Sequence, residues 1–162
     1  MDPNAEIRTQ IVKSILGEQA HLSFEDAVAD FPPDQINTRP TNLPYSFWHL
    51  IEHLRITQLD LLEYITHADY KEGTWPDDYW PDFDAETDVT GWNASIDAFL
   101  TDRDALIAIA ENPTTDLAAG VPTHADHSIE RCLLIVGNHN SYHVGELSIL
   151  RQVMDNWGSS HT

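Results

Sequence analysis

The chain has 162 residues, 41% of them apolar, so it is long enough to bury one sizeable core and is expected to form a single domain over residues 1–162, with its core in about 5–155. The longest apolar runs cover only a few residues, which excludes a transmembrane helix. The 27 acidic residues against 8 basic ones give a formal net charge of −19, and such a surface repels phosphate backbones and anionic lipid, so nucleic-acid and membrane binding are disfavoured.

The first residues and the cysteine content predict a cytoplasmic protein. Residues 1–6 contain neither a basic n-region nor an apolar h-region, so no secretory signal is expected. Cys132 is the only cysteine, and a chain without an intramolecular disulfide suits a reducing compartment.

Two helices are predicted in the first part of the chain. Residues 4–19 carry apolar residues at helical spacing. A shorter helix is expected from the N-cap Ser23 to about Ala29, because Pro32-Pro33 cannot continue it. Residues 34–43 contain turn formers and read as a connection.

A longer helix is predicted over residues 44–66, with Pro44 in its first turn, where a missing N–H costs nothing. One face of this helix is apolar and comprises Phe47, Leu50, Ile51, Leu54, Leu61, Leu62 and Ile65. His53 falls at the margin of that face, and His49 lies further out. If one of the two histidines faces a site beside the core, it is therefore His53.

Residues 67–90 show no helical period and contain Gly73, two prolines, eight acidic residues and five aromatic ones. A connection of this length in a compact domain is usually functional, for example as a lid. The alternative is that Trp75 and Trp80 only anchor the segment to the bundle.

Two further helices complete the predicted fold. Residues 91–111 return to a helical pattern, and residues 112–127 form a loop that carries two more histidines, His124 and His127. Ser128 reads as the N-cap of a last helix that reaches about Met154. Four long helical segments with polar connections predict an all-α helical bundle.

Two histidine pairs occur at i, i+4 spacing in the predicted helices. His139 and His143 project within about 40° of each other, one turn apart, which allows two imidazoles to bind one metal ion. Leu147 and other apolar residues share their side of the helix, so this pair is expected to face the bundle interior. The second pair is His49 and His53.

The resulting hypothesis is a metal site made by His53, His139 and His143. Neutral imidazoles suit Zn²⁺, Ni²⁺ or Fe²⁺ at about 2.0–2.2 Å, and three protein ligands leave coordination positions open, as in catalytic sites. Cys132 lies two turns before His139, about 10 Å along the helix axis, so it is expected to be a small buried apolar residue and not a ligand.

The alternative is that these are core histidines bonded to one another or to carboxylates, because His-x₃-His pairs arise by chance in many helices. The pair also differs from the zinc-protease signature, since Asn140-Ser141 stand where a Glu would act as base. Ser141 has no nucleophile elbow, and the chain has no phosphate-binding glycine loop or dinucleotide fingerprint. The lone His21 is expected to form hydrogen bonds or pack.

The acidic composition has two interpretations. One is solubility or adaptation to high salt, where screening removes self-repulsion. The other is a field that collects cations around a metal site.

Several segments together resemble the DinB-like (DinB/YfiT) superfamily of bacterial proteins. The two main ones are residues 43–56 (LPYSFWHLIEHLRI) and 138–147 (NHNSYHVGEL). Residues 20–27 (AHLSFEDA) and 75–81 (WPDDYWP) resemble one branch of the superfamily. The resemblance spans roughly residues 5–155, and the order and spacing of the segments make it specific.

The resemblance implies an up-down four-helix bundle that is often dimeric. It also implies a divalent metal ion held by one histidine of the second long helix and two of the fourth, which are His53, His139 and His143 here. It implies no DNA binding. Characterised relatives are metal-dependent transferases of low-molecular-weight thiols, so a thiol or an electrophile is the expected small-molecule partner.

Two functions are therefore expected. The first is a metal-dependent enzyme of the thiol-transferase or hydrolase type, in which the ion generates a nucleophile at neutral pH. Its catalytic residues cannot be assigned, but His49, Glu52 or Gln58 would orient a ligand imidazole. The alternative is a non-catalytic, metal-stabilised interaction module that acts through its homodimer or a protein partner.

Overall fold

The structure is a computed structural model that describes residues 2–17 and 19–157. Its helices are α1 (Ala5–Leu16), α2 (Phe24–Val28), α3 (Phe47–Thr66), α4 (Val89–Glu111) and α5 (Ile129–Val153), with 3-10 turns η1 (Pro33–Gln35) and η2 (Asp77–Tyr79) and strands β1 (Gly120–Val121) and β2 (His124–Ser128). The prediction of an all-α bundle is confirmed. None of the described helices is both long enough and apolar enough to cross a membrane.

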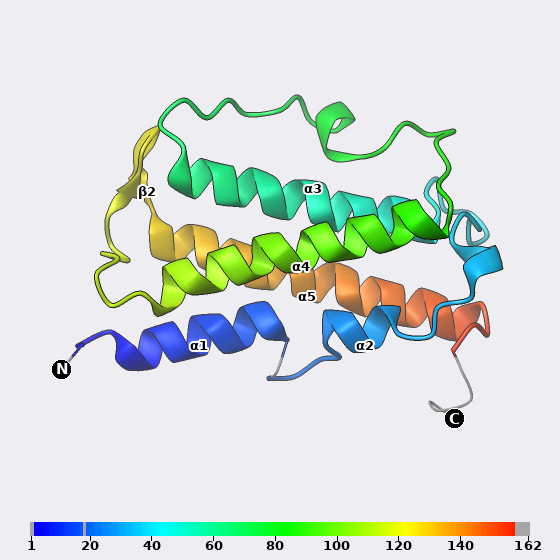
Figure 1. Cartoon of the computed structure of the whole chain (residues 1–162), viewed down its shortest axis with the longest axis horizontal. Coiled ribbons are helices and arrows are strands. Elements are labelled where there is room, and N and C mark those ends of the chain that lie inside the picture. The colour runs from blue at the N-terminus through cyan, green and yellow to red at the C-terminus, as the bar shows by residue number, and fades with distance from the viewer. Residues whose placement is uncertain (1, 18, 158–162) are drawn as a thin grey trace.

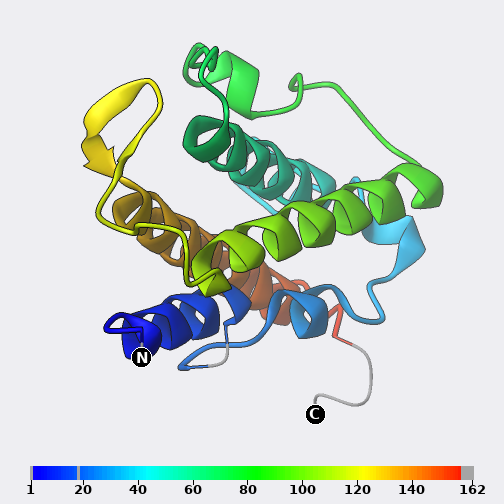
Figure 2. The same ribbon diagram turned by 60° about the vertical axis from the view of Figure 1, so that its left-hand side comes forward.

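The helices form a four-sided bundle in which α1 and α2 follow one another along one side (Figure 1). α3 packs against α4 and α5, and α1 packs against the same two helices from the opposite side. Figure 1 also shows that α3 and α4 run in the same direction, opposite to α1 and α5. The connection 67–90 must therefore return along the length of the bundle, and Figure 2 shows it on the α3 side, far from α1 and α2.

Side-chain caps explain where the long helices begin. α3 starts at Phe47 because the Ser46 hydroxyl accepts a hydrogen bond from the backbone N–H of His49. The placement of Pro44 in the first helical turn was therefore wrong, since Pro44 precedes the cap. The predicted cap Ser128 is confirmed and accepts from the N–H of Arg131.

Other predictions along the chain also differ from the structure: α4, predicted over 91–111, begins at Val89. The first helix ends at Leu16 and not at residue 19, because Gly17 adopts a left-handed conformation (φ 78°) that terminates it. The segment 112–127, predicted as a loop, contains most of the antiparallel β1–β2 hairpin. Its second strand, HADHS, is polar and mostly exposed, so it lacked the apolar alternation that predicts a strand.

The apolar core is divided into two clusters. The cluster at the N-terminal end of α3 includes Phe24, Phe47, Leu50, Phe99 and Leu147. The cluster at the opposite end includes Ile11, Ile65, Leu106, Leu133 and Cys132, which confirms the cysteine as a buried apolar residue. Between the two clusters, α3 and α5 carry buried polar side chains, among them Gln58 and Asn140.

Candidate metal centre

Three histidines meet in this polar layer, between α3 and α5. One ring nitrogen from each of His53, His139 and His143 lies within 4.8 Å of the other two. The ring centroids are 4.6–5.2 Å apart. In the described part of the chain, no other His, Cys, Asp or Glu side chains form a group of three or more that could hold a metal ion. The structure thus brings together the three residues expected from the sequence.

A buried amide pair sets the alignment of the two helices that carry these histidines. The Gln58 amide on α3 donates to the backbone carbonyl of Phe99 on α4 at 2.6 Å and accepts from Asn140 on α5 at 2.9 Å. Gln58 and Asn140 are only 1% and 4% exposed, so each lost bond would leave a buried polar group unpaired. The pair therefore holds α3 and α5 in the alignment that places His53 beside His139.

The Nδ1 atom of each histidine already has a partner. His53 Nδ1 donates to the Tyr79 carbonyl at 2.7 Å, and His143 Nδ1 donates to the Glu146 carboxylate at 2.8 Å. His139 Nδ1 lies 3.5 Å from the Thr57 hydroxyl. Carbonyl and carboxylate oxygens can only accept, so they place the proton on Nδ1 and leave the lone pair on Nε2. Such outer partners orient a ligand imidazole and raise its basicity.

The protonation of the histidines also suits a cation. Burial lowers the pKa of His53 from 6.5 to about 4; the bond to Tyr79 opposes this shift and the neighbouring His143 adds to it. Burial likewise lowers the pKa of His139 to about 4, helped by the two adjacent imidazoles. Both rings are therefore neutral at neutral pH and offer lone pairs to a metal ion.

Glu146 is held as a carboxylate beside this cluster. Burial raises its pKa, but hydrogen bonds from His143 and Tyr45 outweigh burial and leave the pKa below its ordinary value. The Tyr45 hydroxyl donates to one carboxylate oxygen while His143 bonds the other. Burial, and then this bond, raise the pKa of Tyr45, so its hydroxyl keeps its proton.

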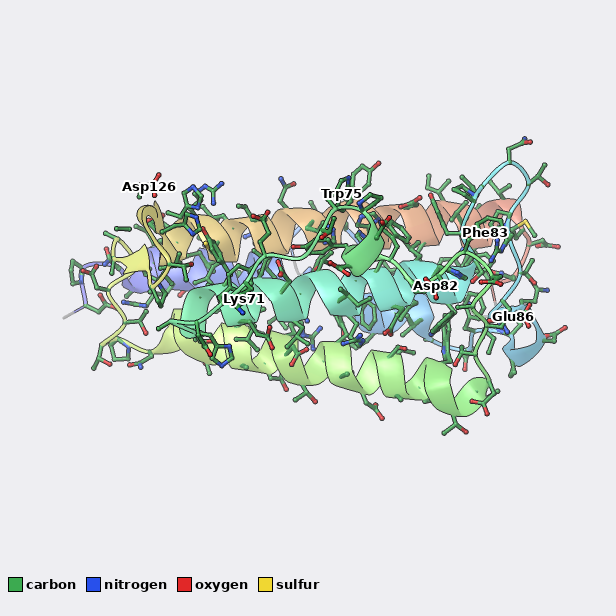
Figure 3. The ribbon with its side chains drawn as sticks, turned by 90° about the horizontal axis from the view of Figure 1, so that it is seen from above. Lys71, Trp75, Asp82, Phe83, Glu86 and Asp126 are labelled. Carbon is green, nitrogen blue, oxygen red and sulfur yellow. The ribbon has the colours of Figure 1, made fainter. Side chains whose placement is uncertain are left out.

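The connection 67–90 covers the site. Figure 3 shows it running along the bundle over α3 and α5, with Trp75 between Lys71 and Phe83. The Trp80 ring stacks on His53 with centroids 3.8 Å apart and planes 6° apart. Trp75 is 67% exposed and only approaches His53 edge-on at 6.4 Å. The anchoring role considered for both tryptophans therefore applies to Trp80 alone.

The residues expected to orient the ligand imidazoles bind elsewhere. His49 is 2% exposed and not on the outer side of α3; its ring nitrogens bond the Ser46 hydroxyl and the Asp82 carbonyl. This prediction failed because the connection 67–90 buries a helix face that the helical pattern alone assigns to solvent.

The other two expected residues also bond away from the histidines. Glu52 accepts from Arg55 and Ser95, at 2.6–2.9 Å. Gln58 bonds Phe99 and Asn140, as described above, so it positions the helices and not an imidazole.

The actual partners are Thr57, the Tyr79 carbonyl and Glu146. Glu146 follows His143 by three residues on one helix, a spacing at which side chains meet, so the sequence contained a signal for this contact. A backbone carbonyl contributed by a distant connection leaves no such signal.

Three other histidines of the described residues lie outside the cluster. His21 bonds the Leu22 carbonyl and the Ser141 hydroxyl, which agrees with its expected hydrogen-bonding role. His124 and His127 stack at 5.4 Å on β2.

The lowered histidine pKa values predict a pH-dependent stability of the metal-free protein. Between pH 6.5 and about 4, His53 and His139 take up protons in the unfolded chain before they do so in the folded one. The free energy of unfolding should therefore fall as the pH is lowered through this range and be insensitive to these two groups above it. Urea denaturation in the presence of a chelator measures it. Replacing His53→Gln and His139→Gln should flatten the curve; an unchanged slope would contradict the assignment.

One family of known proteins matches most of the chain. A family model described as the DinB superfamily matches residues 17–147, a range that includes all three histidines and Glu146. Neither the search of curated proteins nor that of solved structures found a match. Because the matched range covers most of the 162 residues, the chain belongs to the DinB superfamily.

Proposed function

We propose that the chain binds one divalent metal ion through the Nε2 atoms of His53, His139 and His143 and is a metal-dependent enzyme. The observation that supports this most strongly is the convergence of three ring nitrogens within 4.8 Å while each Nδ1 is held by another group. In a tetrahedral zinc site, ligand nitrogens lie roughly 3.3 Å apart. Small side-chain rotations would therefore bring the three rings to one ion.

The ligand set favours an open site. Structural zinc sites close with four protein ligands, whereas catalytic sites use three. Among the described residues, the cluster contains three side chains and no fourth His, Cys, Asp or Glu. Glu146 is adjacent, but His143 and Tyr45 occupy its two oxygens. Three imidazoles suit Zn²⁺, Ni²⁺ or Fe²⁺.

An ion in this position would lower the pKa of a thiol or water that it binds, which suits a transferase or hydrolase acting on a thiol or an electrophile. Neighbouring groups of the protein orient and cover the candidate ligands. The Tyr79 carbonyl and the Glu146 carboxylate fix the rings of His53 and His143. Trp80 covers one face of His53 and excludes water from it. The protonated Tyr45 hydroxyl donates a hydrogen bond to the Glu146 carboxylate oxygen that His143 does not bond.

The alternative is a non-catalytic module in which the ion only ties α3 to α5. The Gln58–Asn140 pair already aligns these helices without metal, which argues for the enzyme. We also propose, from membership of the superfamily, that the protein is a homodimer, and from its sequence that it works in the cytoplasm.

Removing two ligands should abolish metal binding. His139→Ala/His143→Ala leaves one imidazole, and we expect elemental analysis of the purified protein to show no bound Zn, Ni or Fe, whereas the wild type carries about one ion per chain. The matched control is His124→Ala/His127→Ala, which removes two stacked histidines outside the cluster and should keep the wild-type metal content. Metal at full stoichiometry in the first variant would exclude the proposed ligands.

Substitutions of Glu146 and Glu52 test whether a carboxylate that bonds a ligand imidazole affects metal affinity. Glu146→Gln should weaken metal affinity by about tenfold or more, because the neutral amide polarises His143 less than a carboxylate does. Glu52→Gln should leave the affinity unchanged, since Glu52 bonds Arg55 and Ser95 and no histidine of the cluster. Isothermal titration with the same ion measures both, and equal losses would contradict the role given to Glu146.

Chelation separates the two functions. For an enzyme, removing the ion should abolish turnover in a screen of common thiols and electrophiles and lower the melting temperature only slightly. A large loss of thermal stability, with no turnover of any thiol or electrophile by the metal-loaded protein, would favour the structural module.

A further inference from the structure

A pocket of about 470 Å³ lies beside the histidine cluster, between the segment before α3 and residues 76–83 of the connection. Three prolines and three aromatic residues, Tyr45, Trp80 and Phe83, form most of its wall, and His49 and two aspartates, Asp77 and Asp82, complete it. Figure 3 shows Asp82 and Phe83 together over the N-terminal part of α3. Its size and mostly apolar wall are those of small-molecule sites.

Two residues of this wall also connect the pocket to the histidine cluster. Trp80 lines the pocket and stacks on His53 at 3.8 Å. Tyr45 lines the pocket and donates to Glu146, which in turn holds His143. A molecule in the pocket therefore lies one side chain, Trp80, away from His53 and two side chains, Tyr45 and Glu146, away from His143.

Arg39 holds the outer rim of the pocket together. Its guanidinium donates to the carbonyls of Pro44 and Phe83, which come from the two segments that face each other across the pocket. It also lies 4.1 Å over the Phe83 ring. Arg39 is thus engaged with backbone oxygens and an aromatic face, and it does not line the pocket.

The charge of the wall is negative and unbalanced. Asp77 and Asp82 are exposed, and within the described residues neither carboxylate has an ion-pair or hydrogen-bond partner. His49 offers only its ring face, because Ser46 and the Asp82 carbonyl bond its two nitrogens. No lysine or arginine lines the pocket.

Aromatic faces and free carboxylates both favour cations. A cation over an aromatic ring is attracted by the negative face of the ring, and more strongly when water is excluded. An anion would meet two carboxylates here and, at longer range, a chain of net charge −19. We propose that this pocket binds a small organic cation, an ammonium attached to an apolar or aromatic body, and presents that molecule to the histidine cluster. The identification of this cation as the substrate rests on the proposed function, but its binding does not.

Three probes of one shape test the charge preference: phenethylamine, phenethyl alcohol and hydrocinnamate. Isothermal titration or saturation-transfer NMR at low salt, near neutral pH, should show binding in the order amine, alcohol, carboxylate, with the amine at least roughly fivefold tighter than the carboxylate. Comparable affinities, or no binding of the amine at millimolar concentration, would overturn the proposal.

Variants test the location. Asp77→Asn/Asp82→Asn should weaken the amine severalfold, while Asp69→Asn/Asp126→Asn, which removes the same charge from exposed sites outside the pocket, should have a much smaller effect. Phe83→Ala should weaken the amine and, to a smaller extent, the alcohol, because it removes an aromatic wall that contacts both and attracts only the cation. Equal effects of the two aspartate pairs would mean that net charge, and not the pocket, attracts the amine.

Both titrations are carried out with metal-loaded and with chelator-treated protein. Amine binding by wild-type protein that takes up no Zn, Ni or Fe when these ions are supplied would refute the proposed metal function and leave the pocket assignment standing. Normal metal binding without amine binding would refute the pocket assignment and leave the proposed metal function standing.

Discussion

The hydrogen bond between the side chains of Gln58 and Asn140 is the contact on which the arrangement of this bundle depends. Two apolar clusters lie on either side of it, and apolar packing alone tolerates sliding of one helix along another. A buried amide pair that also binds the Phe99 carbonyl resists such sliding, because a shift of one helix would leave several buried polar groups unpaired. The histidines lie next to this pair, so the polar layer that fixes the alignment also carries the candidate site.

The connection between α3 and α4 covers the site because of the direction in which these helices run. Because α3 and α4 run in the same direction, the chain between them must return along the whole bundle (Figure 1). It does so over α3 and α5, where it supplies the Tyr79 carbonyl to His53 and the Trp80 ring that stacks on His53. The long connection is thus both a topological requirement and part of the candidate metal centre.

Charge acts differently at the two halves of the candidate site. In the histidine cluster, burial keeps the imidazoles of His53 and His139 neutral, which suits a metal cation. In the adjoining pocket, the carboxylates of Asp77 and Asp82 have no partner among the described residues, which is the basis for the proposed binding of an organic cation. Both features agree with the interpretation of the acidic composition as a field that concentrates cations, although they do not require it, since two local carboxylates are sufficient for the pocket.

Local patterns in the chain were enough to predict the four helical segments, the cap at Ser128 and the trio His53, His139 and His143, because helical periodicity is a short-range property and places side chains on a face. The position of His53 at the margin of the apolar helix face predicted that this histidine, and not His49, faces the candidate site, and the structure places it there. Which groups orient the imidazoles was decided only by the fold, because the Tyr79 carbonyl comes from 26 residues away and carries no side-chain signature. The burial of His49 and the pocket beside Trp80 likewise arise from a connection without helical period, whose path depends on the packing of α3, α4 and α5 and not on its own sequence.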